Sequence, residues 1–306
     1  MLKLGIVGMS DGNAHPYSWS SIINGRFDAE EISRVGYPAV ASYLAANRET
    51  LGLPQARVTH VWAQDSTMAD SIALSAGIDK VVHSLEEMTG EVDAVLLCRD
   101  DPENHVAMAT PFLEAGCPLF IDKPLAVTRQ DLSWFEAQAS RGRFFMSCSS
   151  MHYAVECRAI RQEMDSLGSA ELITAVGKKD WTKYGVHMLE AVFSILGDNN
   201  VYSVVNTGSS GREVVTLEFK SGLLVTLHLF MDIAGTFQVS YFGKNGWRLA
   251  DIKNSYAMFR DNIIEFIRSV QEGKPRIPFE ETKKIMQVLI AGTESREAGG
   301  SKIIID

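Results

Sequence analysis

Strand-like and helix-like segments alternate through the first half of the chain, and this alternation limits the possible folds more than any other feature. The segment VDAVLLC at residues 92–98 is apolar almost throughout, which is typical of a strand buried on both faces of a parallel sheet. The other strand-like segments are 2–8, 58–63, 80–84, 118–122 and 144–150, and helix-like segments lie at 67–78, 104–116 and 128–142. Such alternation predicts βαβ units that form a doubly wound parallel sheet.

The region between the first two strands is longer than a simple βα unit requires. It has about fifty residues and contains the helix-like segment GYPAVASYLAANRETLG at 36–52. We therefore expect a helical excursion there rather than a long irregular loop.

The second half has a different pattern. A helix near 155–167, a strand near 170–178 and the apolar helix VHMLEAVFSILG come first. Four segments with period-two alternation follow and predict an antiparallel meander: VYSVVN, EVVTLEF, LLVTLHLF and FQVSYFG. Two helices near 257–272 and 280–298 complete the chain. The predicted fold class is α/β, with an N-terminal Rossmann-like domain and a C-terminal α+β domain on a large open, mainly antiparallel sheet.

Length and net charge limit the functions that the chain can have. A chain of 306 residues is expected to have about two domains. The net charge of −9 disfavours broad binding to nucleic acids or anionic membranes, and no apolar run approaches the ~20 residues needed to span a bilayer. Four scattered cysteines fit reduced thiols better than a disulfide framework, and no metal-binding motif is present. We predict a cytoplasmic protein.

A glycine-containing turn follows the first strand. Gly8, Ser10 and Gly12 form the pattern G-x-S-x-G, in which Ser10 occupies the place of the second glycine of a dinucleotide-binding G-x-G-x-x-G turn. In such turns the backbone amides meet a pyrophosphate at a helix N-terminus. We predict that these three residues bind a cofactor, and an ordinary βα turn is the alternative. A hydrolase nucleophile elbow is disfavoured because it would lie deeper in its fold.

A lysine follows the strand-like segment at 118–122. Lys123 is preceded by Asp122 and followed by Pro124, so it lies at the carboxyl end of a strand, where doubly wound sheets bind ligands. An isolated lysine is more often a solvated surface group. Its place at this edge nevertheless makes Lys123 a candidate for catalysis and for cofactor binding.

The segment DAVLLCRDDPENHVAMATPFLEAGCPLFIDKPLAVTRQDL resembles the Gfo/Idh/MocA oxidoreductase family. His105, Ala115-Gly116 and Lys123-Pro124 match the family pattern in order and spacing. Asp122 replaces the usual Glu, and Cys98-Arg99-Asp100 replaces a Thr-Pro segment. The resemblance implies a Rossmann domain over residues 1–124, with a linking helix and last strand to about 150, and a substrate and oligomerisation domain over 125–306.

A second block, DWTKYGVHMLEAVFSILGD, resembles the family pattern Asp-x-Gly-x-His-x-x-Asp. His187 falls on the family's catalytic histidine, and Glu190 stands in for its later Asp. Lys183 replaces the first Asp, which in the family helps to hold the substrate, and this change indicates a substrate that bears a carboxylate or phosphate. Without the family, a histidine that opens an apolar helix is more often a structural group.

The resemblance implies hydride transfer between a nicotinamide cofactor and a small polyhydroxylated substrate, such as a sugar, sugar acid or cyclitol. Lys123 and His187 are the predicted catalytic pair at one substrate carbon: the ammonium stabilises a developing alkoxide, and the imidazole moves the hydroxyl proton. The predicted substrate-binding residues are His152, Lys183 and Tyr184.

The cofactor is predicted to be NAD or NADP. After VTHVW the chain continues Ala63-Gln64-Asp65-Ser66 without a basic residue, which favours NAD. Asp65 either binds the adenosine ribose or caps the following helix.

Two other functions remain open. A cofactor- or ligand-binding regulatory protein could use the same fold without turnover, and NAD-assisted glycoside cleavage occurs within the family. Family members commonly pair through the open sheet, which implies a homodimer or homotetramer.

Overall fold

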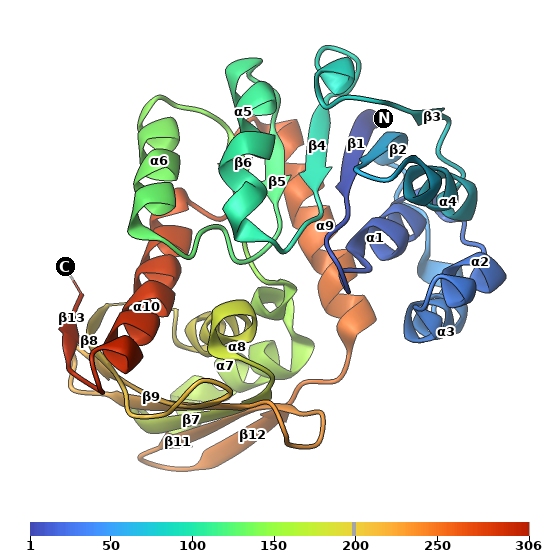
Figure 1. Cartoon of the computed structure of the whole chain (residues 1–306). Coiled ribbons are helices and arrows are strands. Elements are labelled where there is room, and N and C mark those ends of the chain that lie inside the picture. The colour runs from blue at the N-terminus through green and yellow to red at the C-terminus, as the bar shows by residue number, and fades with distance from the viewer. Residues whose placement is uncertain (198–199, 306) are drawn as a thin grey trace. The chain divides into compact units, whose positions relative to one another are not determined.

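The computed structural model describes residues 1–197 and 200–305, which form two compact units (Figure 1). Unit 1 comprises Met1–Leu125, Ser133–Ser147 and Phe259–Phe279. Unit 2 comprises Ala126–Leu132, Cys148–Met258 and Glu280–Asp306. Both units are therefore assembled from separate segments of the chain.

Unit 1 is built on a six-stranded parallel sheet with the order β3-β2-β1-β4-β5-β6. Its strands are β1 (Leu2–Gly8), β2 (Ala56–Ala63), β3 (Lys80–Val81), β4 (Ala94–Leu97), β5 (Leu119–Ile121) and β6 (Phe145–Met146). All residues of β4 are buried, as its continuous apolar sequence predicts. The strand order reverses beside β1, so the carboxyl ends of β1 and β4 form the edge at which doubly wound sheets bind ligands.

The helices of unit 1 begin and end at residues that suit those positions. The helices are α1 (His15–Asn24), α2 (Ala29–Arg34), α3 (Pro38–Ala46), α4 (Ser66–Ala76), α5 (His105–Glu114), α6 (Arg129–Ser140) and α9 (Ser255–Glu272), and the 3₁₀ turns are Arg48–Thr50, Glu86–Met88 and Pro102–Asn104. Of α6 and α9, the parts from Ser133 and from Phe259 onward belong to this unit. Asp65 caps α4, and Gly77 ends it at φ 63°. Within this unit Phe266 of α9 packs edge-on against Phe120 of β5, with 5.7 Å between the ring centroids.

Unit 2 is built on a seven-stranded mixed sheet with the order β12-β11-β7-β10-β9-β8-β13. Its strands are β7 (Ala170–Lys178), β8 (Val201–Asn206), β9 (Arg212–Phe219), β10 (Leu224–Phe230), β11 (Phe237–Gly243), β12 (Trp247–Asp251) and β13 (Ile303–Ile304). All neighbouring pairs are antiparallel except β7 with β10. The predicted fold class is thus confirmed for both units.

The predicted four-strand meander is correct only from β8 to β10. β11 does not pair with β10, because β7 lies between them, parallel to β10 and antiparallel to β11. The alternation of each strand satisfies either arrangement, since the buried face is the same in both. The connection 231–236 consequently runs past the carboxyl end of β7.

The helices of unit 2 cover one side of its sheet (Figure 1). They are α7 (Val155–Leu167), α8 (Trp181–Leu196) and α10 (Phe279–Glu297), preceded by a 3₁₀ turn at Ser150–Tyr153. Trp181 of α8 is fully buried, and its indole N–H donates to Leu289 O of α10 at 2.8 Å. Gly292 permits this packing, because a Cβ there would lie 2.7 Å from the indole ring.

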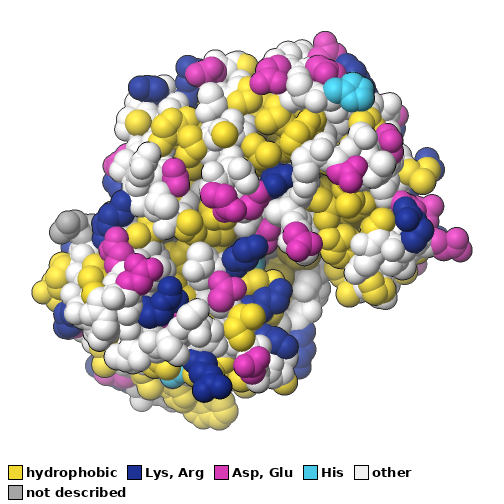
Figure 2. Space-filling model, viewed as in Figure 1, with side chains coloured by type: hydrophobic (Ala, Val, Ile, Leu, Met, Phe, Trp, Pro, Cys, Tyr) yellow, Lys and Arg dark blue, Asp and Glu magenta, His cyan; other side chains and the backbone are white. Residues whose placement is uncertain are grey.

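Charged side chains of both signs are interspersed on the face of the molecule seen in Figure 2. This distribution agrees with a modest acidic excess spread over the chain. The four cysteines are all buried and form no disulfide among the described residues. Within residues 1–197 and 200–305, no helix has the length and apolarity that crossing a bilayer requires.

Candidate active site

The turn after β1 has the features of a phosphate-binding turn. Gly8 is required by close packing, because a Cβ there would lie 2.6 Å from Pro16 Cγ of α1. Gly12 adopts φ 75°, and the amides of Asp11, Gly12 and Ala14 donate to no group in the described part of the chain. Free amides at a helix N-terminus suit an anion, so the residues present fit a cofactor phosphate.

Ser10 and Lys123 meet at one carboxylate. Ser10 Oγ donates to Asp100 Oδ1, and the Asp100 amide donates back to Ser10 Oγ at 2.9 Å. Lys123 Nζ lies 3.5 Å from Asp100 Oδ2, and both side chains are largely buried. The ends of β1, β4 and β5 are therefore joined through Asp100, which balances the charge of the Lys123 ammonium.

Asp122 fixes the start of α1. Its carboxylate is 1% exposed and accepts hydrogen bonds from Asn13 Nδ2 at 2.8 Å and from the Lys123 amide at 2.8 Å. His15 Nδ1 lies 2.5 Å from Asp122 Oδ2. Burial opposes ionisation of Asp122, but His15, Lys123 and Asn13 together hold the pKa of this carboxyl well below its usual range.

Arg99 spans three strand ends. Its guanidinium forms a two-point ion pair with Asp101 and donates to Gln64 Oε1 at 2.6 Å and to Met9 O at 3.3 Å. Gln64 also accepts from the Met9 amide at 3.1 Å. This arrangement fixes the backbone of the glycine-containing turn from the side of β2.

Asp65, the predicted ribose ligand, is exposed and caps α4. Its Oδ1 accepts from the amide of Thr67 at 2.8 Å and from its hydroxyl at 2.7 Å. These bonds lower the pKa of Asp65. The helix cap, one of the two predicted alternatives, is present, and a role of Asp65 toward a cofactor stays a prediction.

In unit 2, His187 lies on α8 and is held by the segment after β6. Its Nδ1 lies 2.5 Å from Ser149 Oγ. A serine hydroxyl both donates and accepts, so Ser149 can pair with Nδ1 of either neutral tautomer of His187. Ser149 is itself fixed, since its amide donates to Glu190 Oε1 at 3.2 Å and its Oγ accepts from the Met151 amide at 3.1 Å.

Glu190 connects His187 to the second predicted histidine of this unit. Its carboxylate is 2% exposed, and Oε2 lies 3.0 Å from His152 Nδ1. Burial lowers the pKa of His152, but the Glu190 carboxylate outweighs burial, so the net pKa is raised. The structure thus brings His152 and His187 into one network through Ser149 and Glu190.

Tyr184 also belongs to the surroundings of His187. The two ring centroids are 5.0 Å apart, and the Tyr184 ring stacks on Phe237 of β11 at an interplanar angle of 8°. Lys183, by contrast, is exposed, and its amide donates to Asp180, the N-cap of α8. Lys123 belongs to unit 1, whereas His187, His152, Lys183 and Tyr184 belong to unit 2.

Sequence reasoning missed several residues that organise the site. Asp100, Asn13 and Ser149 have no diagnostic motif, and only their positions directly after β4, β1 and β6 could have indicated them. His105 is fully buried, with its ring nitrogens 3.0 Å from Leu125 O and 2.9 Å from Arg99 O. This family-matching histidine therefore joins the loops after β4 and β5.

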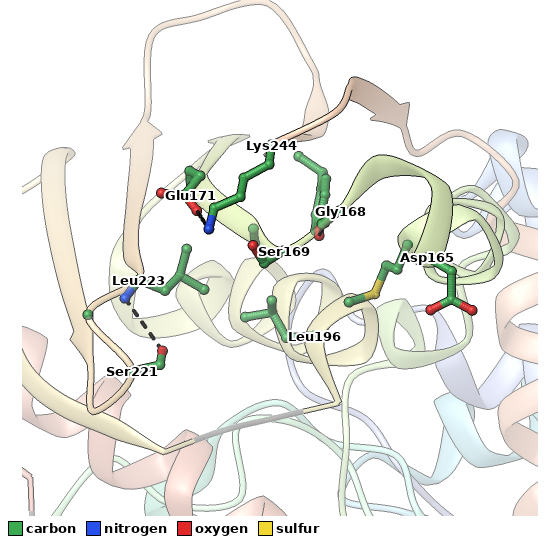
Figure 3. A pocket seen from close by; sticks show the side chains of 12 residues that line it. Asp165, Gly168, Ser169, Glu171, Leu196, Ser221, Leu223 and Lys244 are labelled. Atoms are coloured by element: carbon green, nitrogen blue, oxygen red, sulfur yellow. Dashed lines mark hydrogen bonds and ion pairs between the residues drawn. The ribbon is translucent and has the colours of Figure 1, made fainter.

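A cavity of about 710 Å³ lies elsewhere in unit 2, where α7 and α8 end and β7 begins (Figure 3). Lys244 and Glu171 point toward each other across it, with 3.6 Å between Nζ and Oε1. None of the predicted site residues lines it. The described residues also contain no group of three or more potential metal ligands.

The six-stranded sheet, with its strand-order reversal and glycine-containing turn, defines unit 1 as a dinucleotide-binding fold. Residues 32–146 match the model of the oxidoreductase family with an NAD-binding Rossmann fold, GFO_IDH_MocA. Over these residues the match agrees with the resemblance to the Gfo/Idh/MocA oxidoreductase family that the sequence predicts.

The chain also resembles curated proteins, and solved structures share its fold. Inositol 2-dehydrogenase 1 of Saccharopolyspora erythraea is 28% identical over 230 residues, which cover 65% of this chain and 67% of that protein. The fold resembles that of a myo-inositol dehydrogenase from Corynebacterium glutamicum, with a TM-score of 0.78, 15% identity and coverage of 100% and 99% of the two chains. The fold also resembles that of scyllo-inositol dehydrogenase from Lactobacillus casei, solved with NAD(H) and scyllo-inositol. The TM-score is 0.77, the sequence identity is 13%, and the match covers 99% of each chain.

The Glu190–His152 pair predicts a pH-dependent stability. Because the pKa of His152 is raised in the folded state, the pair stabilises the fold fully below the ordinary histidine pKa near 6.5, and this contribution is lost as the pH rises through the raised value. In Glu190→Gln the stabilising charge is absent. We expect the difference in unfolding free energy between wild type and Glu190→Gln to be largest near pH 6 and to shrink toward pH 9 in urea titrations.

An NMR titration gives the direct check. With Glu190 replaced, burial dominates, so the pKa of His152 should fall below its ordinary value. An unchanged His152 pKa in Glu190→Gln would contradict the assignment of Glu190 as its partner.

Proposed function

We propose that the protein is an NAD(P)-dependent oxidoreductase that transfers a hydride between the nicotinamide and a CH–OH carbon of a cyclitol or a closely related polyhydroxylated substrate. The observation that carries the proposal is the buried Lys123 ammonium, paired with Asp100 at the carboxyl edge of the Rossmann sheet. The family match and the inositol dehydrogenase named among the relatives support the substrate class.

His187 is the proposed general acid–base. Hydride leaves a carbinol carbon only as the hydroxyl proton is removed, and an imidazole can accept that proton near neutral pH. In the tautomer whose Nδ1–H donates to Ser149 Oγ, Nε2 carries the lone pair that would accept the substrate's hydroxyl proton. In the reverse direction, His187 returns the proton to the nascent alkoxide.

Lys123 is the proposed electrostatic catalyst. The ammonium stabilises the oxygen of the substrate as negative charge develops on it, and polarises a carbonyl in the reverse direction. Its largely buried position limits competition from water. The nicotinamide, when bound, supplies the hydride acceptor or donor.

The cofactor would be held by the turn at Gly8, Ser10 and Gly12, with Lys123 beside it. We favour NAD over NADP, because Gln64 and Asp65 follow β2 without a basic residue that would pair with a 2′-phosphate. The proposed substrate-binding residues are His152, Tyr184 and Lys183. His152 shares the Glu190 network with His187, the Tyr184 ring neighbours His187, and Lys183 lies on the same helix.

Replacement of Lys123 by Met tests the catalytic assignment. The apolar side chain keeps much of the volume but removes the charge, so we expect kcat to fall by a factor on the order of 10²–10⁴ while NADH binding is retained. Lys80→Met, which removes an exposed lysine from β3 of the same unit, is the control and should match wild type. A Lys123→Met enzyme with near wild-type turnover would exclude the proposed role.

Titration with NADH and, separately, NADPH tests the cofactor. We expect nicotinamide fluorescence to show tighter binding of NADH, since Gln64 and Asp65 after β2 are not basic and the nearby Arg99 guanidinium is already paired with Asp101. If the folded protein binds neither nucleotide, the altered turn has lost its ligand, and the regulatory function becomes the better explanation.

The predicted homo-oligomer is supported by a partly exposed apolar row on the sheet of unit 2. Trp247, Phe242, Leu172 and Leu224 are in register across β12, β11, β7 and β10, and Trp247 is 62% exposed. Such a continuous row is typical of a surface that another subunit covers.

The double variant Trp247→Asp/Phe242→Asp should therefore dissociate the assembly into monomers in sedimentation experiments, because it buries two carboxylates in the interface. Identical sedimentation of the variant and the wild type would exclude this face as the interface.

A further inference from the structure

Lys179 has a strained backbone just before α8, the helix that carries the proposed acid–base His187. It directly follows β7 and adopts φ 82°, the one positive φ of a non-glycine residue within residues 1–197 and 200–305. Long side chains rarely adopt this region, and residues that do so cluster where the side chain has a function. Glycine would adopt the same conformation without strain.

The surrounding backbone keeps Lys179 in this conformation. Its amide donates to Phe230 O of β10 at 3.0 Å, and the amide of Lys178 donates to Thr236 O at 3.1 Å. Asp180, the next residue, caps α8 through the Lys183 amide at 2.9 Å. The turn is thus fixed on both sides by contacts that do not use the lysine side chain, so the fold itself gives no reason for a lysine here.

The side chain of Lys179 is directed at Tyr184. Its Nζ donates to the Tyr184 hydroxyl at 2.6 Å and lies 4.3 Å from the ring centroid. Tyr184 in turn neighbours His187 and stacks on Phe237. A cation is therefore held next to the aromatic group that flanks the proposed acid–base.

This cation has no carboxylate partner. Lys179 forms no ion pair with any Asp or Glu of the described residues, and Asp180 is engaged with the α8 N-terminus. An ammonium has three N–H donors, and the Tyr184 hydroxyl takes one of them. The others can donate to an anionic ligand.

We propose that Lys179 and Tyr184 form an anion-recognition pair that selects a polyhydroxylated substrate bearing a carboxylate or phosphate. The inference rests on the proposed dehydrogenase function and narrows its substrate class. Both lysines are exposed, and the proposal assigns the anion to Lys179 rather than to Lys183 because the Lys179 ammonium is held at Tyr184, beside His187.

The test measures the binding of matched ligands to the protein by titration calorimetry, with NADH present and with NADH absent. The pairs are D-glucuronate with D-glucose, and myo-inositol 1-phosphate with myo-inositol; each differs by one anionic group. We expect wild type to bind the anionic member of at least one pair about tenfold or more tightly, as one charge-assisted contact of ~1.4 kcal/mol would give.

Lys179→Gly is the decisive variant, because glycine relieves the backbone strain while it removes the cation. We expect the preference for the anionic ligand to be lost while the thermal midpoint stays equal or rises. A structural role alone would lower the midpoint instead. Lys244→Met, which removes an exposed lysine from the same unit, should keep the preference.

Three results would each overturn the inference. They are equal affinity for both members of each pair, no binding of either anionic ligand, and loss of the preference in Lys183→Met but not in Lys179→Gly. Failure of the proposed function shows differently, as the absence of NADH binding or of NAD⁺ reduction with every polyol. Anion preference with these defects would leave a binding protein that uses the same pair.

Discussion

The carboxyl edge of the unit 1 sheet depends on the contacts that the buried carboxylate of Asp122 makes. An ionised carboxylate out of contact with water is costly unless several donors meet it, and here Asn13, His15 and the Lys123 amide all do so. The cluster joins the turn after β1 to the end of β5, two strands apart in the sheet. It thereby fixes the backbone from which Lys123 extends. It also holds the turn after β1, whose glycine pattern departs from G-x-G-x-x-G.

Unit 2 uses the same device with a different residue. Glu190 is as deeply buried as Asp122, and it fixes Ser149 and His152 from one carboxylate. Ser149 then orients His187, so the proposed acid–base is positioned through an intermediary. In both units a carboxylate that faces no solvent determines the geometry of a neighbouring residue with a proposed chemical role.

Most elements could be predicted because their patterns are local. The apolar run of β4, the caps of α4 and the alternation of β9 each report the environment of their own side chains. The position of β7 between β10 and β11 could not be predicted in this way, since pairing depends on partners more than fifty residues away and leaves the alternation unchanged. For the candidate site, motifs mark Lys123 and His187, so these two residues could be proposed from the sequence. Asp100, Ser149 and the strained turn at Lys179 are defined by long-range contacts, which a single sequence does not encode locally.

The discontinuous composition of unit 1 has a consequence for biosynthesis. Phe266 of α9 packs on Phe120, and Phe259 of the same helix neighbours Trp19 and His15. A nascent chain that has not yet reached these residues leaves the aromatic faces exposed, and β13 at 303–304 completes the other sheet still later. Neither unit can therefore mature while the ribosome is still translating the first two thirds of the message, and a prematurely terminated product would be a target for proteolysis rather than a working nucleotide-binding fragment.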